Sequence, residues 1–251
     1  MVLSQSDLYS AFDSPAEEII EFLMWLAGNA SLPPTLHVAD VGSGPGRLFA
    51  PLVRGGWTIT AYEPDPEYAG AAAALAASLG RSVVVKRGGF EDIGETGAFD
   101  MVLGINSSFA HLLTPAQRGA GLRCVRRALR PQGLLVLDLP NFTWILEHYR
   151  PPVPQERSLG GAQVRLEREH RIDRPGRMFT TIDHYQITGI GSGPQVATKT
   201  HVYSIISLDE LLAQLSAAGF EGIRDFSSFG SRVSQPTPGA RLLLVGTAGA
   251  A

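Results

Sequence analysis

The chain has 251 residues, a formal net charge of −3, 44% hydrophobic residues and 18% charged residues. Disordered chains are poor in apolar residues and rich in charge, so this composition excludes disorder as the main feature. The slightly acidic balance argues against a protein that binds nucleic acid through its overall charge. The length predicts one large domain, or one domain with a modest insertion.

Cys124 is the only cysteine, so the chain has neither an intrachain disulfide nor a cysteine cluster for a metal. No basic region followed by an apolar run stands at the N-terminus, and no stretch approaches about 18 continuous apolar residues. We therefore expect no signal peptide, no transmembrane helix and a cytoplasmic location.

Helices and short apolar strands alternate along the first part of the chain. Capping boxes at Ser14, Thr114 and Ser207 predict helices over 15–27, 115–129 and 208–218. Between helical segments, continuous apolar runs predict strands that are covered on both faces, over 36–41, 58–63, 82–86, 99–105 and 133–139. This order predicts a parallel sheet with right-handed crossovers.

The pattern changes after Leu139. A proline cluster at 151–154 is followed by runs of mixed polarity at 163–173, 178–190 and 198–206, which predict antiparallel, half-exposed strands. Two last strands are expected at 222–229 and 241–247. The chain thus divides into an N-terminal arm and helix (1–30), an α/β core (31–150), a β-rich insertion (151–206) and a C-terminal helix with two strands (207–251).

A glycine-rich turn, Gly42-Ser43-Gly44-Pro45-Gly46, stands where the first core strand ends. Glycine permits positive φ and lets a ligand approach the backbone, and ligands of open α/β sheets bind beyond the carboxyl ends of the strands. The GxGxG spacing differs from the GxGxxG of dinucleotide sites, and the chain has no P-loop sequence. Glu63 ends the next strand, where its carboxylate can accept both hydroxyls of a ribose; the alternative is an ordinary surface acid.

Over residues 36–140 the chain resembles the class I S-adenosylmethionine-dependent methyltransferases, with looser similarity to residue 247. The resemblance rests on motifs that occur in order at 40–46, Glu63, 88–93, 98–103 and 129–135. It implies a Rossmann-like seven-stranded α/β sheet with a reversed last hairpin, and an antiparallel β insertion after the fifth strand. Gly89 and Gln132 depart from the usual Asp and Gly of the family.

The resemblance also implies S-adenosylmethionine as the cofactor. The residues expected to contact it are Asp40, Gly42, Ser43, Gly44, Gly46, Arg47, Glu63, Pro64, Gly89, Phe90, Glu91, Ile105, Asn106 and Ser107. The partner of the adenine amino group stays open between Glu91, Asp92 and the backbone.

The string Gly104–Leu112 resembles that of bacterial sugar N-methyltransferases and glycine-type N-methyltransferases, where an inserted sheet covers the pocket. This implies methyl transfer to a nitrogen or oxygen of a small molecule, under the insertion 151–206 and a lid at 1–30. His111 is the candidate base or acceptor contact, or else a helix cap. Tyr9 either closes over the cofactor or anchors the arm.

The segment after the fifth strand supplies candidate acceptor contacts. Asn141 is a candidate hydrogen-bond partner, and Trp144 and Tyr149 are candidate walls, although helical spacing also fits Tyr149 as plain core. The histidines of the insertion have neither HxH nor HExxH spacing, so we predict no metal site.

Three other functions remain as alternatives. A protein or nucleic-acid methyltransferase would use the arginine face of the 115–129 helix, formed by Arg123, Arg126, Arg127 and Arg130. A non-catalytic binder would keep the nucleoside site without turnover. An NAD-dependent oxidoreductase is disfavoured by the loop spacing and by the lack of a Tyr-x-x-x-Lys pattern. We expect a small-molecule acceptor, with no nucleic acid and no membrane as partners; the oligomeric state stays open, a homodimer among its alternatives.

Overall fold

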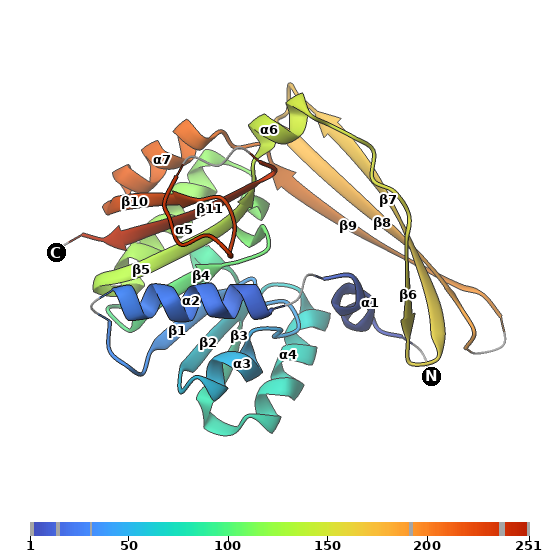
Figure 1. The fold of residues 1–251 in the computed structure, drawn as a ribbon, viewed down its shortest axis with the longest axis horizontal. Coiled ribbons are helices and arrows are strands. Elements are labelled where there is room, and N and C mark those ends of the chain that lie inside the picture. The colour runs from blue at the N-terminus through green and yellow to red at the C-terminus, as the bar shows by residue number, and fades with distance from the viewer. Residues whose placement is uncertain (1–2, 14–15, 31, 191–192, 236–238, 250–251) are drawn as a thin grey trace.

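The computed structural model describes residues 3–13, 16–30, 32–190, 193–235 and 239–249. A seven-stranded sheet with helices on both faces forms one part of the molecule, and a four-stranded antiparallel sheet projects from its side (Figure 1). The helices are α1 (Gln5–Phe12), α2 (Glu17–Asn29), α3 (Phe49–Arg54), α4 (Pro66–Ser78), α5 (Pro115–Ala128), α6 (Phe142–Glu147) and α7 (Leu208–Ala217).

The strands of the large sheet lie in the order β10-β11-β5-β4-β1-β2-β3. Their bounds are β1 (His37–Val41), β2 (Thr58–Glu63), β3 (Val83–Arg87), β4 (Phe99–Gly104), β5 (Leu129–Pro140), β10 (Phe220–Phe226) and β11 (Arg241–Ala248). Strands β1 to β5 pair in parallel, whereas β11 runs antiparallel to both β5 and β10. The predicted α/β sheet with a reversed last hairpin is confirmed. Strands β1 and β4 are neighbours, so chain connections leave their carboxyl ends in opposite directions and open a ligand site there.

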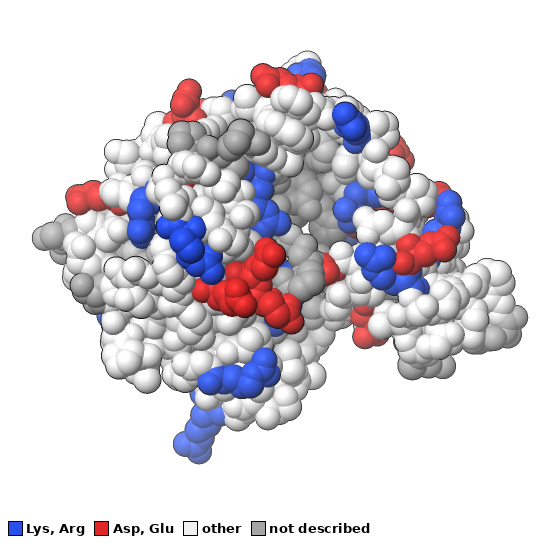
Figure 2. Space-filling view, viewed as in Figure 1, with Lys and Arg blue, Asp and Glu red and all other residues white. Residues whose placement is uncertain are grey.

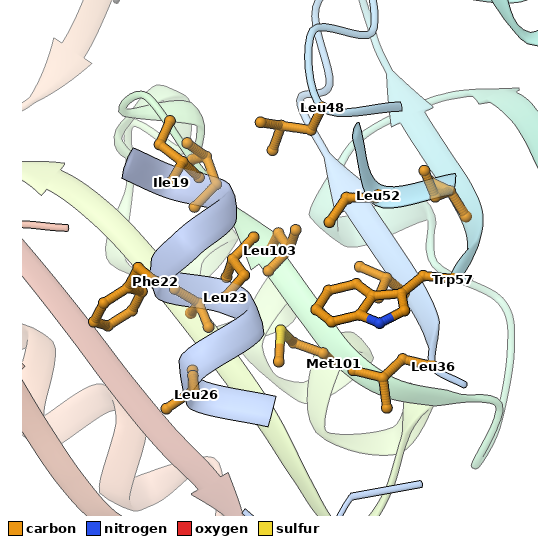
Figure 3. Close-up of a cluster of buried hydrophobic side chains, with 14 of the residues drawn as sticks. Ile19, Phe22, Leu23, Leu26, Leu36, Leu48, Leu52, Trp57, Met101 and Leu103 are labelled. Carbon is orange, nitrogen blue, oxygen red and sulfur yellow. The ribbon is translucent and has the colours of Figure 1, made fainter. Parts of the chain in front are cut away.

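Helix α2 is a buried layer of the core. Ile19, Phe22, Leu23 and Leu26 are all at most 3% exposed and pack in one cluster with Trp57, which precedes β2, and with residues of the large sheet (Figure 3). The predicted apolar stripe of this helix is therefore correct. The expected capping box at Ser14 and Pro15 lies outside the described residues, and the helix runs through Gly28 to Asn29, past the predicted end. Within the expected N-terminal segment 1–30, α2 packs against the large sheet, whereas Leu8 of α1 belongs to a separate apolar cluster with residues of the second sheet.

The second sheet has the order β6-β7-β8-β9, with all neighbours antiparallel. Its strands are β6 (Gln155–Leu159), β7 (Ala162–Asp173), β8 (Met178–Thr188) and β9 (Gln195–Ser204). The sequence pattern predicts β7, β8 and β9 but misses β6. One end of the inner face packs on α1, where Leu8 joins a small apolar cluster with Val164, Leu166 and Tyr185.

Short 3-10 turns complete the core: η1 (Gly80–Ser82), η2 (Phe90–Asp92) and η3 (Ser108–His111). Turn η3 follows β4 and contacts the second sheet, because Ser204 of β9 donates its hydroxyl to the backbone oxygens of Ala110 and Leu112, at 3.2 and 3.1 Å. Among the described helices, none is long and apolar enough to cross a membrane.

Candidate functional site

A cavity of about 960 Å³ lies between the carboxyl ends of the parallel strands and the inner face of the second sheet. Figure 2 shows the face of the molecule that is hollowed between these two parts. Small-molecule sites are usually concave and occupy about 300–1,000 Å³. The volume of the cavity therefore suits a small ligand.

The glycine loop follows β1 and forms one wall of this cavity. Gly42, Gly44 and Gly46 all have positive φ, of 72°, 55° and 93°. A Cβ at Gly42 would lie 2.5 Å from Ser108, and one at Gly46 would lie 2.6 Å from the Phe49 ring, so packing alone requires these two glycines. A Cβ at Gly44 would meet only the Tyr9 ring, at 3.8 Å. Gly44 is therefore the point where backbone faces the open cavity.

Glu63, at the end of β2, is held against this loop. Its carboxylate accepts hydrogen bonds from the Gly44 amide at 2.7 Å and the Asp65 amide at 2.8 Å, and the residue is 5% exposed. Burial raises the pKa of Glu63, and these two amides oppose the shift. Because a carboxylate has about four lone-pair positions, each oxygen keeps capacity to accept a ligand hydroxyl.

Four of the expected cofactor residues do not line the cavity: Asp40, Ser43, Gly46 and Arg47. Asp40 is 3% exposed beneath the loop, and burial raises its pKa to about 7, with Glu63 adding to the rise and Arg47 opposing it. Arg47 pairs with Asp13 at 3.0 Å, beyond the end of α1. These residues surround the loop, whereas the remaining cofactor candidates line the cavity itself.

The segment after β3 lines the cavity next to Glu63, with Gly89, Phe90, Glu91 and Asp92; the Gly88 amide just before it donates to the Glu63 backbone oxygen at 3.3 Å. Asp92 accepts the Gly89 amide at 2.8 Å and so closes the turn. A side chain at Gly89 would have nothing within 4 Å. The usual acid of the family is thus absent at a position that has room for a ligand edge.

The turn after β4 is held in an unusual backbone conformation. Asn106 and Ser107 have φ of 55° and 71°, and Asp138 supports both, since its side chain accepts the Asn106 amide and its backbone oxygen accepts the Ser107 amide, each at 2.9 Å. The Asn106 side chain donates to the Tyr9 hydroxyl and, at 3.3 Å, to Asp13. This turn therefore ties α1 to the core. Beside it, the Ser108 hydroxyl oxygen lines the cavity and is buried without a hydrogen-bond partner among the described residues.

His111 lines the cavity at the end of η3. Its Nδ1 lies 2.9 Å from the backbone oxygen of Val202, and a carbonyl oxygen can only accept, so Nδ1 carries the hydrogen. The neutral ring then has its lone pair on Nε2. Burial lowers the pKa of His111, which favours this neutral form. The Tyr203 and His201 rings lie 4.6 and 5.9 Å from the His111 ring.

Comparison with known proteins relates this geometry to methyltransferases. Residues 38–133 match the family model of a methyltransferase domain. The matched stretch contains the glycine loop, Glu63 and His111, so the core side of the cavity belongs to the part of the chain that resembles a methyltransferase domain. No curated protein matches the chain in sequence.

Solved methyltransferase structures share the whole fold. A Clostridium acetobutylicum S-adenosylmethionine-dependent methyltransferase is 12% identical with a TM-score of 0.79, and 97% of each chain is covered. DesVI of Streptomyces venezuelae is 18% identical with a TM-score of 0.76, over 98% of this chain and 99% of that one. The sugar N-methyltransferase KedS8 of a Streptoalloteichus species is 21% identical with a TM-score of 0.75, over 100% of this chain and 95% of that one. At such identities the likeness concerns the fold.

The main cavity is also lined by residues of the second sheet that the sequence analysis did not identify. Arg168 of β7 forms two hydrogen bonds with the buried Asp183 of β8, at 2.5 and 2.8 Å. Lys199 of β9 pairs with Asp65 at 2.6 Å and lies over the Tyr68 ring. Strand register aligns Arg168, Asp183 and Lys199 in one row. Alternation of polar and apolar residues along a strand can indicate which side chains share one face of a sheet. The sequence of a single strand does not show which residue of the neighbouring strand each one pairs with.

The three candidate acceptor contacts after β5 do not line this cavity. The side chain of Asn141 caps α6 by accepting the Trp144 amide at 3.3 Å. Trp144 and Tyr149 border a neighbouring cavity of about 380 Å³. The short helix α6 presents Phe142 and Ile145 to the main cavity instead. Contact of Asn141, Trp144 and Tyr149 with an acceptor stays a prediction.

Proposed function

We propose that this protein is a methyltransferase that transfers a methyl group from S-adenosylmethionine to a nitrogen or an oxygen of a small-molecule acceptor. The observation that supports this most directly is the cavity between the glycine loop and the second sheet, which joins the expected cofactor wall to a roof of polar and aromatic side chains. The similar KedS8 structure is described as a sugar N-methyltransferase, which agrees with a small acceptor.

The residues at the loop fit the cofactor. Gly44 leaves backbone open to the cavity, and Glu63 presents a carboxylate that two amides hold in place. Bound S-adenosylmethionine supplies a methyl group that is already electrophilic because it is attached to a sulfonium. The protein then has mainly to align the acceptor at near-attack distance, a contribution that reaches about 7–11 kcal/mol in well-oriented systems.

His111 is the proposed base. The Val202 carbonyl fixes Nδ1 as the protonated nitrogen, so Nε2 can take the proton that a hydroxyl or ammonium acceptor must lose. Tyr203 holds the imidazole ring from the side of the second sheet. Tyr9 contributes by closing α1 over Gly44, where its ring lies against the loop.

A polymer acceptor is the second function that we considered. Three of the four arginines that would attract it are engaged within the protein: Arg126 donates to the backbone oxygens of Gly219 and Gly249, Arg127 to that of Ile93, and Arg130 to Asp100. The second sheet also stands over the cavity, where a polymer requires an open groove. These contacts favour a small acceptor.

The proposal is tested with methyl-labelled S-adenosylmethionine and panels of small amines and alcohols, with bulk tRNA and histones as parallel acceptors. We expect label to move to members of the small-molecule panel. Label that moves only to the polymers would contradict the proposal. Tight binding of S-adenosylhomocysteine without transfer to any acceptor would support the non-catalytic alternative.

A further inference from the structure

A second cavity, of about 380 Å³, adjoins the main one. Its lining consists of Trp144, Ile145, His148, Tyr149, Arg150 and His170. Ile145 and His170 border both cavities, so the two cavities adjoin at these two side chains. The second cavity thus lies next to the proposed acceptor site, and a ligand that occupied both would cross at Ile145 and His170.

Flat side chains dominate this second cavity. The Trp144 and His148 rings are stacked, with centroids 4.4 Å apart and planes inclined by 12°. His148 directly follows α6 and lies one helical turn after Trp144; its Nδ1 is 3.0 Å from the Trp144 backbone oxygen, which holds the imidazole against the indole. The Tyr149 ring stands 5.9 Å from the His170 ring. Rings in such surroundings associate best with another aromatic ring, by stacking or edge contact.

The charges around the second cavity select among aromatic ligands. Arg150 is exposed at its border, and none of its six lining residues is acidic. Burial and the neighbouring Arg168 lower the pKa of His170, so its ring is predominantly neutral at pH 7. A neutral or anionic ring therefore suits this cavity better than a cationic one.

His170 supplies a second observation at the border between the cavities. Its Nδ1 is buried without a hydrogen-bond partner among the described residues. A buried polar atom without a partner is unfavourable, and such atoms are rare in native proteins. A polar group of a ligand that crosses the border would pass beside this ring.

We infer that the acceptor has two parts. The group that receives the methyl lies by His111 in the main cavity, and a flat, neutral or anionic aromatic ring of the same molecule lies on Trp144 in the second cavity. This inference rests on the proposed function, because it treats the main cavity as the site of methyl transfer. It assigns Trp144 a specificity role toward the distal ring rather than a role in forming the wall of the main cavity.

The test uses protein loaded with S-adenosylhomocysteine and two series of probes. The first series runs from benzylamine to 6-phenylhexylamine, and the second consists of n-alkylamines with the same alkyl chains. Affinities are measured by isothermal titration calorimetry. We expect the longer phenylalkylamines to bind about three- to tenfold more tightly than their alkylamine partners, the gain of an aromatic contact. Benzylamine, which is too short to span both cavities, should show no such gain.

Variants locate the gain. Trp144→Leu should bring the two series to within about twofold of each other, and Trp144→Phe should retain most of the difference. Thr143→Ala is the matched control, because Thr143 is exposed on the same helix and lines neither cavity. A phenyl gain that survives Trp144→Leu, or wild-type protein that shows no gain at any length, would overturn the inference. Failure of wild-type protein to bind S-adenosylhomocysteine would instead contradict the proposed function.

Discussion

At the scale of single residues, Glu63 joins the loop to the proposed ribose site. It is the one acid that accepts the Gly44 amide among the described hydrogen bonds, and it is anchored from both sides. Glu63→Ala should weaken S-adenosylhomocysteine binding by roughly 1.5–3 kcal/mol for each charge-assisted hydrogen bond that is lost. Glu63→Gln keeps one carbonyl oxygen and should lose less. Calorimetric titration measures both, with the exposed Glu21→Ala on α2 as control; an unchanged affinity would reject the ribose assignment.

His111 permits a prediction about rate and pH. Its lowered pKa means that the imidazole stays neutral, and able to accept a proton, below the pH at which an ordinary histidine becomes charged. His111→Ala should reduce kcat about 10²- to 10⁴-fold while S-adenosylhomocysteine affinity changes little. The acidic limb of the pH–kcat profile should lie below pH 6.5 in the wild type and should disappear in the variant. Identical profiles would remove His111 as the base.

At the scale of elements, α1 connects the second sheet to the core beside the cavity. One face packs on the second sheet through Leu8, while Tyr9 contacts Asn106 of the core and Asp13 contacts Arg47. If α1 closes over the bound cofactor, Tyr9→Ala should raise the dissociation rate of S-adenosylhomocysteine. Tyr9→Phe, which loses only one hydrogen bond of about 0.5–1.5 kcal/mol, should raise it less. Stopped-flow displacement gives the rates, and equal rates in Tyr9→Ala and wild type would mean that α1 is only an anchor.

The sequence predicts the elements of the core well because local pattern and burial agree there. Strand β2 has the predicted bounds, 58–63, and five of its six residues are buried. Strand β6 was missed because nearly all of it is exposed, so it has no apolar pattern and exists through pairing with β7. Helix α1 has only eight residues and two buried side chains, too few for a clear period.

The residues of the candidate site likewise fall into those that a local sequence pattern predicts and those that it does not. Gly44, Glu63 and His111 could be predicted because a motif places each of them at the end of a core strand or just after it. Arg168, Asp183 and Lys199 meet only through the register of three antiparallel strands, which no local segment specifies. Asn141 was expected to form a hydrogen bond with the acceptor; that its side chain caps α6 could not be predicted, because the cap depends on where that helix begins.

At the scale of the whole molecule, polar contacts join the two sheets around the cavity. Lys199 meets Asp65, His111 meets the Val202 carbonyl, and Ser204 bonds the backbone of η3. These contacts connect β9 to both sides of the core, to α4 as well as to the segment after β4. The second sheet is therefore fixed to the core along one of its strands, β9.

The pH dependence of stability depends on a buried acid behind the loop. Asp40 has its pKa raised to about 7 by burial, while in the unfolded chain it returns to about 3.9. The folded state therefore binds more protons between these values, so the stabilising contribution of this group is complete below about pH 4 and is lost as pH rises through 7.

Asp40→Asn removes this titration, because an amide does not ionise. The difference in the free energy of unfolding, variant minus wild type, should increase by about 2–4 kcal/mol from pH 4 to pH 8. Urea denaturation of the cofactor-free proteins measures this difference. Subtracting the wild-type values removes the pH dependence that the two proteins share, such as that of the buried Asp138, whereas the coupling between Glu63 and Asp40 remains part of the measured difference. Glu21→Gln, at an exposed position, should give a difference that hardly depends on pH. Parallel curves for Asp40→Asn and wild type would show that folding does not raise the pKa of Asp40.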